Sequence, residues 1–225
     1  MENKVAELKP LTVEEVESLL GDPNVVFVDT RHADVFTEGF VPSSISLGLE
    51  GKMEEYAKKL LPAGNSIVII ADEGKEEESY NRLKTAGFTG IKGYLEGGYP
   101  AWVKAEKEID IIISIEADEA GIDLSFDENI VVLDVRKQSE YEEGHIDFAV
   151  NLPLFDLADP ATVSTIEDDD SLYIHCAGGY RSVIAASILK KHGLQNMRNI
   201  KGGWKALEQE SRIQDKIVYP KKKSE

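Results

Sequence analysis

The chain has almost no cysteine: Cys176 is the only copy among 225 residues. One cysteine cannot form an internal disulfide, and the first ten residues lack the apolar stretch of a secretory signal, so we expect a cytoplasmic location. No apolar run approaches the ~20 residues that a membrane-spanning helix needs. The formal net charge of −17 makes nucleic acids and anionic membrane surfaces poor partners, and we expect neither.

An internal repeat divides the chain. The segment VVFVDTRHADVFTEGF, which begins at Val25, matches IVVLDVRKQSEYEEGH, which begins at Ile130, with an offset of 105 residues. The same offset aligns LEGGYPAW with IKGGWKAL. A period of this length indicates two copies of one domain rather than a solenoid. We therefore predict one domain over residues 1–107 and a second over residues 108–225.

Each copy alternates strand-like and helix-like segments. In the second copy, the apolar runs at 129–135 and 171–176 predict buried strands, and residues 182–193 predict a helix that ends at a glycine. Residues 197–210 predict a strand, a Gly-Gly turn and a helix. This alternation predicts an α/β fold with two similar domains, each a parallel sheet flanked by helices. Cys176 is then expected at the carboxyl edge of its sheet, where ligands bind in such folds.

The loop CAGGYRS joins the second of these strands to the helix. Gly178 and Gly179 allow the backbone to turn tightly, so that the N–H groups from Ala177 to Arg181 can surround an anion. The N-terminus of the helix adds the positive end of its dipole, and together these groups favour a thiolate at Cys176. Arg181 would pair with an anionic substrate.

The charge near this loop differs between the two copies. Residues 171–207 contain six basic and no acidic side chains, whereas the matching residues 66–102 contain four basic and six acidic ones. The second copy can therefore attract small anions. The alternative is a buried core cysteine, which free cysteines often are. A core cysteine has no need of the glycines, the arginine or the local excess of positive charge.

These motifs resemble the rhodanese family of sulfurtransferases, in a tandem of two domains. The family's first signature is matched by Asp134, Arg136, Gly144 and His145, its active-site loop by HCAGGYRS, and its closing turn by IKGGWKAL. The resemblance implies that Cys176 takes sulfane sulfur from thiosulfate or a low-molecular-weight persulfide and passes it to a thiol or cyanide. The implied partners are a small anionic sulfur donor and a thiol acceptor.

The resemblance also implies roles for the other loop residues. Arg181 would be catalytic with Cys176, because it would orient the donor. The substrate would be bound by Ala177, Gly178, Gly179, Tyr180 and Ser182. The chain is also similar to the rhodanese portion of proteins that fuse a persulfide dioxygenase to tandem rhodanese domains. It has no H-x-H-x-D motif, so we expect no metal and no cofactor.

Two other functions stay open. The protein could be a sulfur carrier or partner-binding module that holds a persulfide without rapid turnover. It could also be a cysteine phosphatase, which we favour less because four residues separate Cys176 from Arg181, where phosphatases have five.

The first copy lacks the chemistry. Ala71 takes the position of Cys176, and Glu76 takes that of Arg181. We expect a non-catalytic domain that packs on the second copy and covers one side of the active site. The alternative is that the acidic loop from Asp72 to Glu78 binds a protein partner.

Four further positions have structural interpretations. Asp134 and Arg136 are expected to form an ion pair that holds the adjacent loop. His145 is expected to make a structural hydrogen bond. The side chain of His175 should point to the opposite face of its strand from the cysteine. Trp204 is expected to pack in the core at the Gly-Gly turn.

Overall fold

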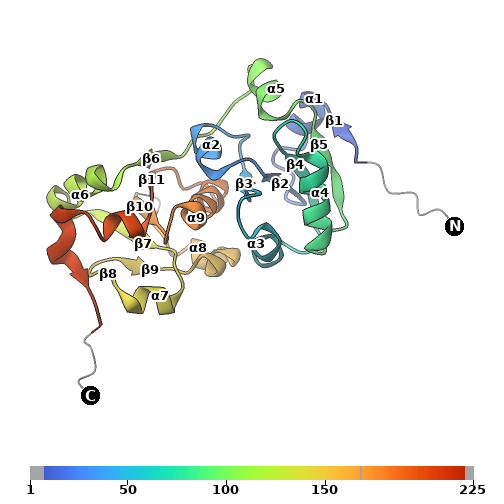
Figure 1. Ribbon diagram of the computed structural model, residues 1–225. Coiled ribbons are helices and arrows are strands. Elements are labelled where there is room, and N and C mark those ends of the chain that lie inside the picture. The colour runs from blue at the N-terminus through green and yellow to red at the C-terminus, as the bar shows by residue number, and fades with distance from the viewer. Residues whose placement is uncertain (1–7, 168, 221–225) are drawn as a thin grey trace. The chain divides into compact units, whose positions relative to one another are not determined.

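The computed structural model describes residues 8–167 and 169–220, so the residues that bear on a secretory signal lie mostly outside it. The described residues form two compact units, of which the first ends at Ile111 and the second begins at Ile112 (Figure 1). Phe40 and Asp110 exchange backbone hydrogen bonds, which keeps the chain with the first unit beyond the predicted boundary after residue 107. Within the described residues, no helix is both long and apolar enough to cross a membrane, and the cytoplasmic location stays a prediction.

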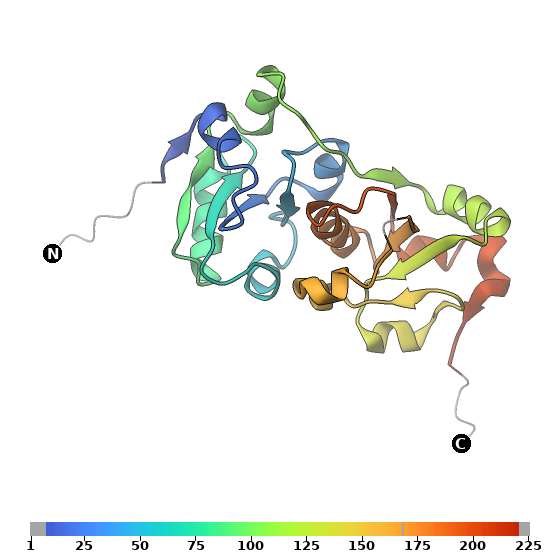
Figure 2. The same cartoon turned by 180° about the vertical axis from the view of Figure 1, so that it is seen from behind.

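The first unit contains a five-stranded sheet. Its elements are β1 Pro10–Leu11, α1 Val13–Glu17, β2 Val25–Asp29, α2 Ala33–Glu38, β3 Ser44–Ser46, α3 Met53–Leu60, β4 Ser66–Ile70, α4 Glu76–Thr85, β5 Ile91–Leu95 and α5 Gly98–Lys104. The strand order is β1-β5-β4-β2-β3, and every neighbouring pair is parallel. The helices flank this sheet (Figure 2).

The second unit repeats this arrangement. Its elements are β6 Ile113–Ile115, α6 Ala117–Phe126, β7 Ile130–Asp134, α7 Gln138–Glu143, β8 His145–Ile146, β9 Val150–Asn151, η1 Leu154–Ala158, α8 Pro160–Val163, β10 Ser171–His175, α9 Tyr180–Lys191, β11 Met197–Ile200, α10 Trp204–Leu207, η2 Ser211–Lys216 and β12 Ile217–Val218. The parallel sheet has the order β6-β11-β10-β7-β9, and β12 pairs with β8 in a separate antiparallel ribbon. The predicted α/β fold with two similar domains is confirmed.

The elements beside Cys176 are buried on all sides. Four of the five residues of β10 are buried, as expected for a central parallel strand with helices on both faces. Every residue from Ser182 to Leu189 of α9 is also buried, so α9 is an interior helix rather than an amphipathic surface helix. It starts at Tyr180, earlier than the apolar pattern indicates, because the tight glycine loop leads directly into its first turn. Gly193, with a φ of +98°, follows its end.

Side chains alternate between the two faces of β10, which ends just before Cys176. Tyr173 belongs to the core cluster that also contains residues of α6 and α10. His175 lies two residues further on and points to the same face, where its ring contacts Trp204. The side chain of His175 thus lies on the face of β10 that packs against Trp204, and Cys176 is the first residue after the strand.

Candidate active site

Cys176 lies in a tight loop between β10 and α9. Its Sγ accepts a hydrogen bond from the backbone N–H of Gly179, at 3.1 Å. Gly179 is the N-cap of α9 and has a φ of +107°, a conformation that favours glycine. The loop therefore directs a backbone N–H and the N-terminus of a buried helix toward the sulfur, an arrangement that stabilises negative charge.

The cysteine side chain is buried, with 1% of the residue exposed. Burial alone suits a structural cysteine as well as a nucleophile. The hydrogen bond to the sulfur separates these interpretations, because a core cysteine has no need of an N–H donor held in place by a glycine with positive φ. The geometry therefore places a backbone hydrogen-bond donor against the sulfur, as the sequence predicts for this loop.

A Gly-Gly-Trp turn holds the base of the cysteine loop. The N–H of Trp204 donates to the carbonyl oxygen of Cys176 at 2.6 Å, and the N–H of Lys205 donates to the carbonyl of Ala177 at 3.2 Å. Gly203 has a φ of +55°, and a Cβ there would collide with the carbonyl oxygen of Cys176. The turn that the sequence singles out is thus bonded to the backbone of the nucleophile.

The predicted substrate-binding residues differ in their surroundings. Ala177, Gly179 and Tyr180 are half-buried and Gly178 is exposed, and their contact with substrate stays a prediction. Ser182 is fully buried, and its hydroxyl donates to the carbonyl of Gly179 at 2.8 Å. Ser182 therefore supports the loop from inside the fold, and its contact with substrate stays a prediction.

The guanidinium of Arg181 is paired with a carboxylate. It donates two hydrogen bonds to Glu140, at 2.6 and 2.7 Å, and the two side chains are only 16% and 31% exposed. The bonds from Arg181 hold the pKa of Glu140 below its ordinary value of 4.5. Arg181 thus anchors the start of α9 to α7, and its contact with an anionic donor stays a prediction.

Sequence analysis missed Glu140, although the repeat holds a signal for it. The offset of 105 residues places Val35 opposite Glu140 and Glu76 opposite Arg181. Both members of the ion pair are therefore replaced together in the first copy. Two side chains that contact each other are expected to be replaced together.

The positive charge near the loop is partly neutralised by acidic residues from other elements. Lys201 forms an ion pair with Glu116 at 3.1 Å, in addition to the Arg181 pair. Lys205 is exposed, and no ion pair or side-chain hydrogen bond joins it to another described residue. The backbone N–H of Lys205 is bonded to the cysteine loop, so Lys205 is an exposed basic residue of the turn that holds this loop.

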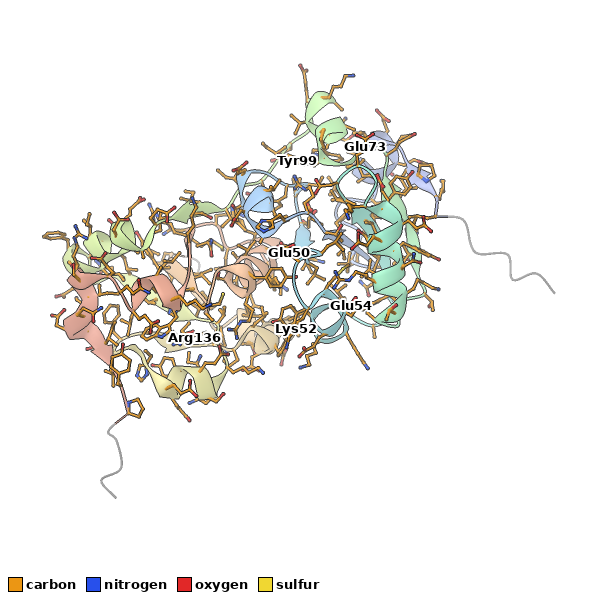
Figure 3. All side chains as sticks on the ribbon, in the orientation of Figure 1. Glu50, Lys52, Glu54, Glu73, Tyr99 and Arg136 are labelled. Carbon is orange, nitrogen blue, oxygen red and sulfur yellow. The ribbon has the colours of Figure 1, made fainter. Side chains whose placement is uncertain are left out.

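A buried ion pair follows the neighbouring strand. Nε and Nη2 of Arg136 donate to the carboxylate of Asp134, and Nη2 also donates to the carbonyl of Gly144 at 2.7 Å. The guanidinium lies 4.4 Å from the centroid of the Trp204 ring (Figure 3 labels Arg136). These contacts confirm the structural roles predicted for the ion pair and for Trp204 at the turn.

His145 also has the structural role that the sequence predicts. Its Nδ1 lies 2.8 Å from the carbonyl oxygen of Tyr141. Its ring stacks on the Tyr141 ring, with the centroids 3.8 Å apart. The side chain is thus occupied by contacts within its own segment.

The first unit keeps the framework without the nucleophile. Arg31 pairs with Asp29 and lies 4.2 Å from the centroid of the Tyr99 ring, labelled in Figure 3. Ala71 is buried after the end of β4, and Gly74 has a φ of +79°, matching the glycine that precedes α9. The loop therefore keeps its turn while it has lost the sulfur. Three glutamates begin α4 in place of the basic residue.

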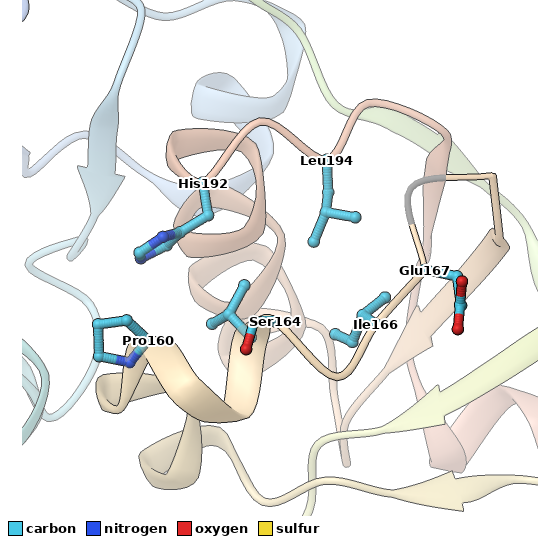
Figure 4. Close-up of a pocket in the computed structure, with 7 residues that line it drawn as sticks. Pro160, Ser164, Ile166, Glu167, His192 and Leu194 are labelled. Carbon is cyan, nitrogen blue, oxygen red and sulfur yellow. The ribbon is translucent and has the colours of Figure 1, made fainter.

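A separate cavity in the second unit is not part of this site. It has a volume of about 410 Å³. Residues of α8 and of the segment just beyond α9, among them Pro160, Ser164, His192 and Leu194, line it (Figure 4). None of its lining residues belongs to the cysteine loop or to the Gly-Gly-Trp turn.

Comparison with known proteins identifies the fold family. The family model described as "Rhodanese-like domain" matches residues 12–105 and 119–210. The chain belongs to the rhodanese-like domain family. The predicted tandem of two rhodanese-like domains is thereby confirmed, and the three signatures that indicated it lie around the loop after β10.

Some of the similar proteins match less than half of this chain and others match most of it. The chain is 37% identical over 91 residues to the "Putative sulfur carrier protein YrkF" of Bacillus subtilis, covering 40% of this chain and 47% of that protein. It thus spans about half the length of this relative. It is 31% identical over 101 residues to the "Putative thiosulfate sulfurtransferase, mitochondrial" of Schizosaccharomyces pombe, covering 40% of this chain and 70% of that protein. The solved thiosulfate sulfurtransferase of Pseudomonas aeruginosa matches 88% of this chain and 41% of its own, with 20% identity and a TM-score of 0.41.

Proposed function

We propose that the second rhodanese-like domain is a sulfurtransferase that carries sulfane sulfur on Cys176. One observation carries this proposal: the Gly179 N–H donates to Sγ at the N-terminus of α9. The same donors that stabilise a thiolate also stabilise the terminal sulfur of a persulfide, which is an anion at neutral pH. Membership of the rhodanese-like family supports this chemistry.

The proposed reaction has two steps. The thiolate of Cys176 attacks the outer sulfur of thiosulfate, a bond forms between Sγ and that sulfur, and the sulfur–sulfur bond of the donor breaks to release sulfite. A persulfide of glutathione type would instead release its thiolate. The terminal sulfur of the enzyme persulfide is then attacked by a thiolate or cyanide, which leaves as a persulfide or thiocyanate and returns the cysteine thiolate. Such a covalent intermediate predicts ping-pong kinetics.

The charges near the loop support a small anionic donor. Arg181 is paired with Glu140, and we infer that the exposed Lys205 adds positive charge beside the loop to which its backbone is bonded. A partner protein at the acidic loop from Asp72 to Glu78 stays a prediction. In that loop, Lys75 and Glu78 form an ion pair at 2.8 Å.

A sulfur carrier is the second candidate function, and the similarity to the "Putative sulfur carrier protein YrkF" of Bacillus subtilis favours it. Turnover separates the two. We expect many molecules of thiocyanate per chain when the protein is incubated with thiosulfate and cyanide, and none from Cys176→Ser. A single sulfur released per chain would support the carrier. Release by Cys176→Ser at the wild-type rate would reject both.

A further inference from the structure

The ring of His175 is fully buried beside the nucleophile. Its Nδ1 lies 3.3 Å from the carbonyl oxygen of Cys176, and its Nε2 lies 3.7 Å from Oδ2 of Asp134. The ring also stacks on Trp204, with the centroids 6.2 Å apart. One side chain therefore lies between the backbone of the nucleophile and the buried ion pair.

Both atoms that face the two ring nitrogens are hydrogen-bond acceptors. A neutral imidazole has one N–H, so only one of the two acceptors can be satisfied while the other faces a lone pair. Nε2 is indeed buried without a hydrogen bond to any described residue. An imidazolium has two N–H groups and would satisfy both acceptors. The surroundings of His175 thus suit two protonation states.

The repeat shows that the fold does not need a histidine here. The first copy has Ile70 at the matching position, and Ile70 is also fully buried. Burying a polar ring with an unpaired nitrogen costs free energy that an isoleucine does not. The histidine occurs in the copy that has the nucleophile, which points to a role in its chemistry.

We propose that His175 is a positioning residue for Cys176: it bonds the cysteine carbonyl through Nδ1 and, when a proton is added at Nε2, bonds Asp134 and favours the anionic sulfur. The inference rests on the proposed function, since it assigns a role at the same site. The added proton gives a positive charge to a ring that contacts the backbone carbonyl of Cys176. In this proposal the reactivity of Cys176 depends on this second ionisation.

Two charged groups act on the ring, Asp134 at the end of β7 and Arg136 just after it. Cys176 acts through its backbone carbonyl, and α10 contributes the uncharged Trp204. Burial is the largest effect and lowers the pKa of His175 below 6.5, Asp134 opposes this, and Arg136 adds to it. Protonation of the ring therefore requires a lower pH than that of an ordinary histidine.

The test is the pH profile of Cys176 alkylation by iodoacetamide, a neutral reagent. In the wild type, we expect thiolate reactivity to fall less steeply on the acid side than one ionisation predicts. His175→Ile, which copies the first unit, should give a single ionisation and a neutral-pH rate about fivefold lower, the equivalent of one ordinary hydrogen bond. His175→Gln keeps a donor for the carbonyl, so it should keep the neutral-pH rate and lose only the acid-side ionisation.

His192→Gln is the matched control, because it removes an exposed histidine that lies outside the site. It should keep the wild-type profile.

The effect of Cys176 on His175 gives a second measurement. If the proton on His175 favours the thiolate of Cys176, the thiolate must favour that proton to the same extent. Carboxamidomethylation of Cys176 removes the thiolate charge, so the pKa of His175, followed by NMR, should fall. Wild-type profiles in both His175 variants, or a His175 pKa indifferent to alkylation, would overturn the proposal.

Alkylation requires no sulfur donor, so this test is independent of sulfur transfer. A changed profile without any persulfide would reject the sulfurtransferase and leave the role of His175 intact. A normal persulfide with unchanged profiles would reject the role of His175 alone.

Discussion

The residues around Cys176 divide into those that contact the sulfur and those that hold the loop. Gly179 donates to Sγ. Ser182 and Arg181 contact the loop backbone and Glu140 instead. Substitutions in the second group should therefore change stability, or the geometry of the loop, before they change the affinity for a donor.

Arg181→Ala tests this distinction. We expect the free energy of unfolding to fall by about 1 kcal/mol, the upper end for a partly exposed ion pair, because the contact is bidentate. Glu140→Gln should lower the free energy of unfolding by a similar amount, and the double variant should lower it by less than the sum of the two.

The same ion pair should make stability depend on pH. The pKa of Glu140 is lowered in the fold, so the ion pair stabilises fully above pH 4.5. This stabilisation is lost as the pH falls through the lower folded-state pKa. Denaturant unfolding at both ends of this range measures it. Additive costs at neutral pH would contradict the coupling.

Lys205 and Lys201 can be compared to test which basic residue attracts the anionic donor. Lys205→Gln should raise the KM for thiosulfate about threefold at low salt, because an exposed charge contributes up to about 1 kcal/mol. The effect should shrink as salt is added. Lys201 is paired with Glu116, so Lys201→Gln should change the KM little. Steady-state kinetics of both variants decide this, and equal effects would count against a specific role for Lys205.

For individual residues, the sequence predicts the candidate nucleophile but not the contacts that support its loop. Cys176, Gly179 and the turn before Trp204 follow from local chemistry, because a glycine loop before a helix has a limited set of geometries. The contact between Arg181 and Glu140 joins residues 41 positions apart. It depends on how α7 packs beside α9, which no local pattern specifies.

Among the elements, the Gly-Gly-Trp turn is the most constrained. Gly203→Ala would force a side chain into a positive φ and against the carbonyl of Cys176. We expect sulfur transfer to fall at least about tenfold, because small displacements of a nucleophile are costly. Gly98→Ala is the control, since it meets the carbonyl of Ala71 at a φ of +58° in the first unit. It should destabilise its own unit and keep the activity. Equal losses of activity would mean that the effect is only one of stability.

The order of the elements follows from the sequence more closely than their ends do. The apolar runs predict β7 and β10, and both form where expected. The helix pattern after the Gly-Gly turn continues to Glu210, but α10 ends at Leu207 and the side chain of Glu210 accepts a hydrogen bond from the N–H of Arg212. Such a local side-chain bond competes with the helix and ends it.

The whole molecule contains two copies of one fold and a single cysteine. We expect Ala71→Cys, made in the Cys176→Ser background, to take up no sulfur from thiosulfate. The backbone turn at Gly74 is present, but three glutamates at the start of α4 repel the donor. Intact-protein mass spectrometry after incubation with thiosulfate measures this. Sulfur uptake by this double variant would show that the second copy's charges are not needed.

The most direct test of the account is the mass of the intact protein before and after incubation with thiosulfate and, separately, with glutathione persulfide. The account predicts a gain of one sulfur atom per chain, which a thiol removes again and which Cys176→Ser does not acquire. The preferred donor is the one that loads the protein faster. No gain with either donor, or an equal gain in Cys176→Ser, would contradict sulfur transfer through Cys176.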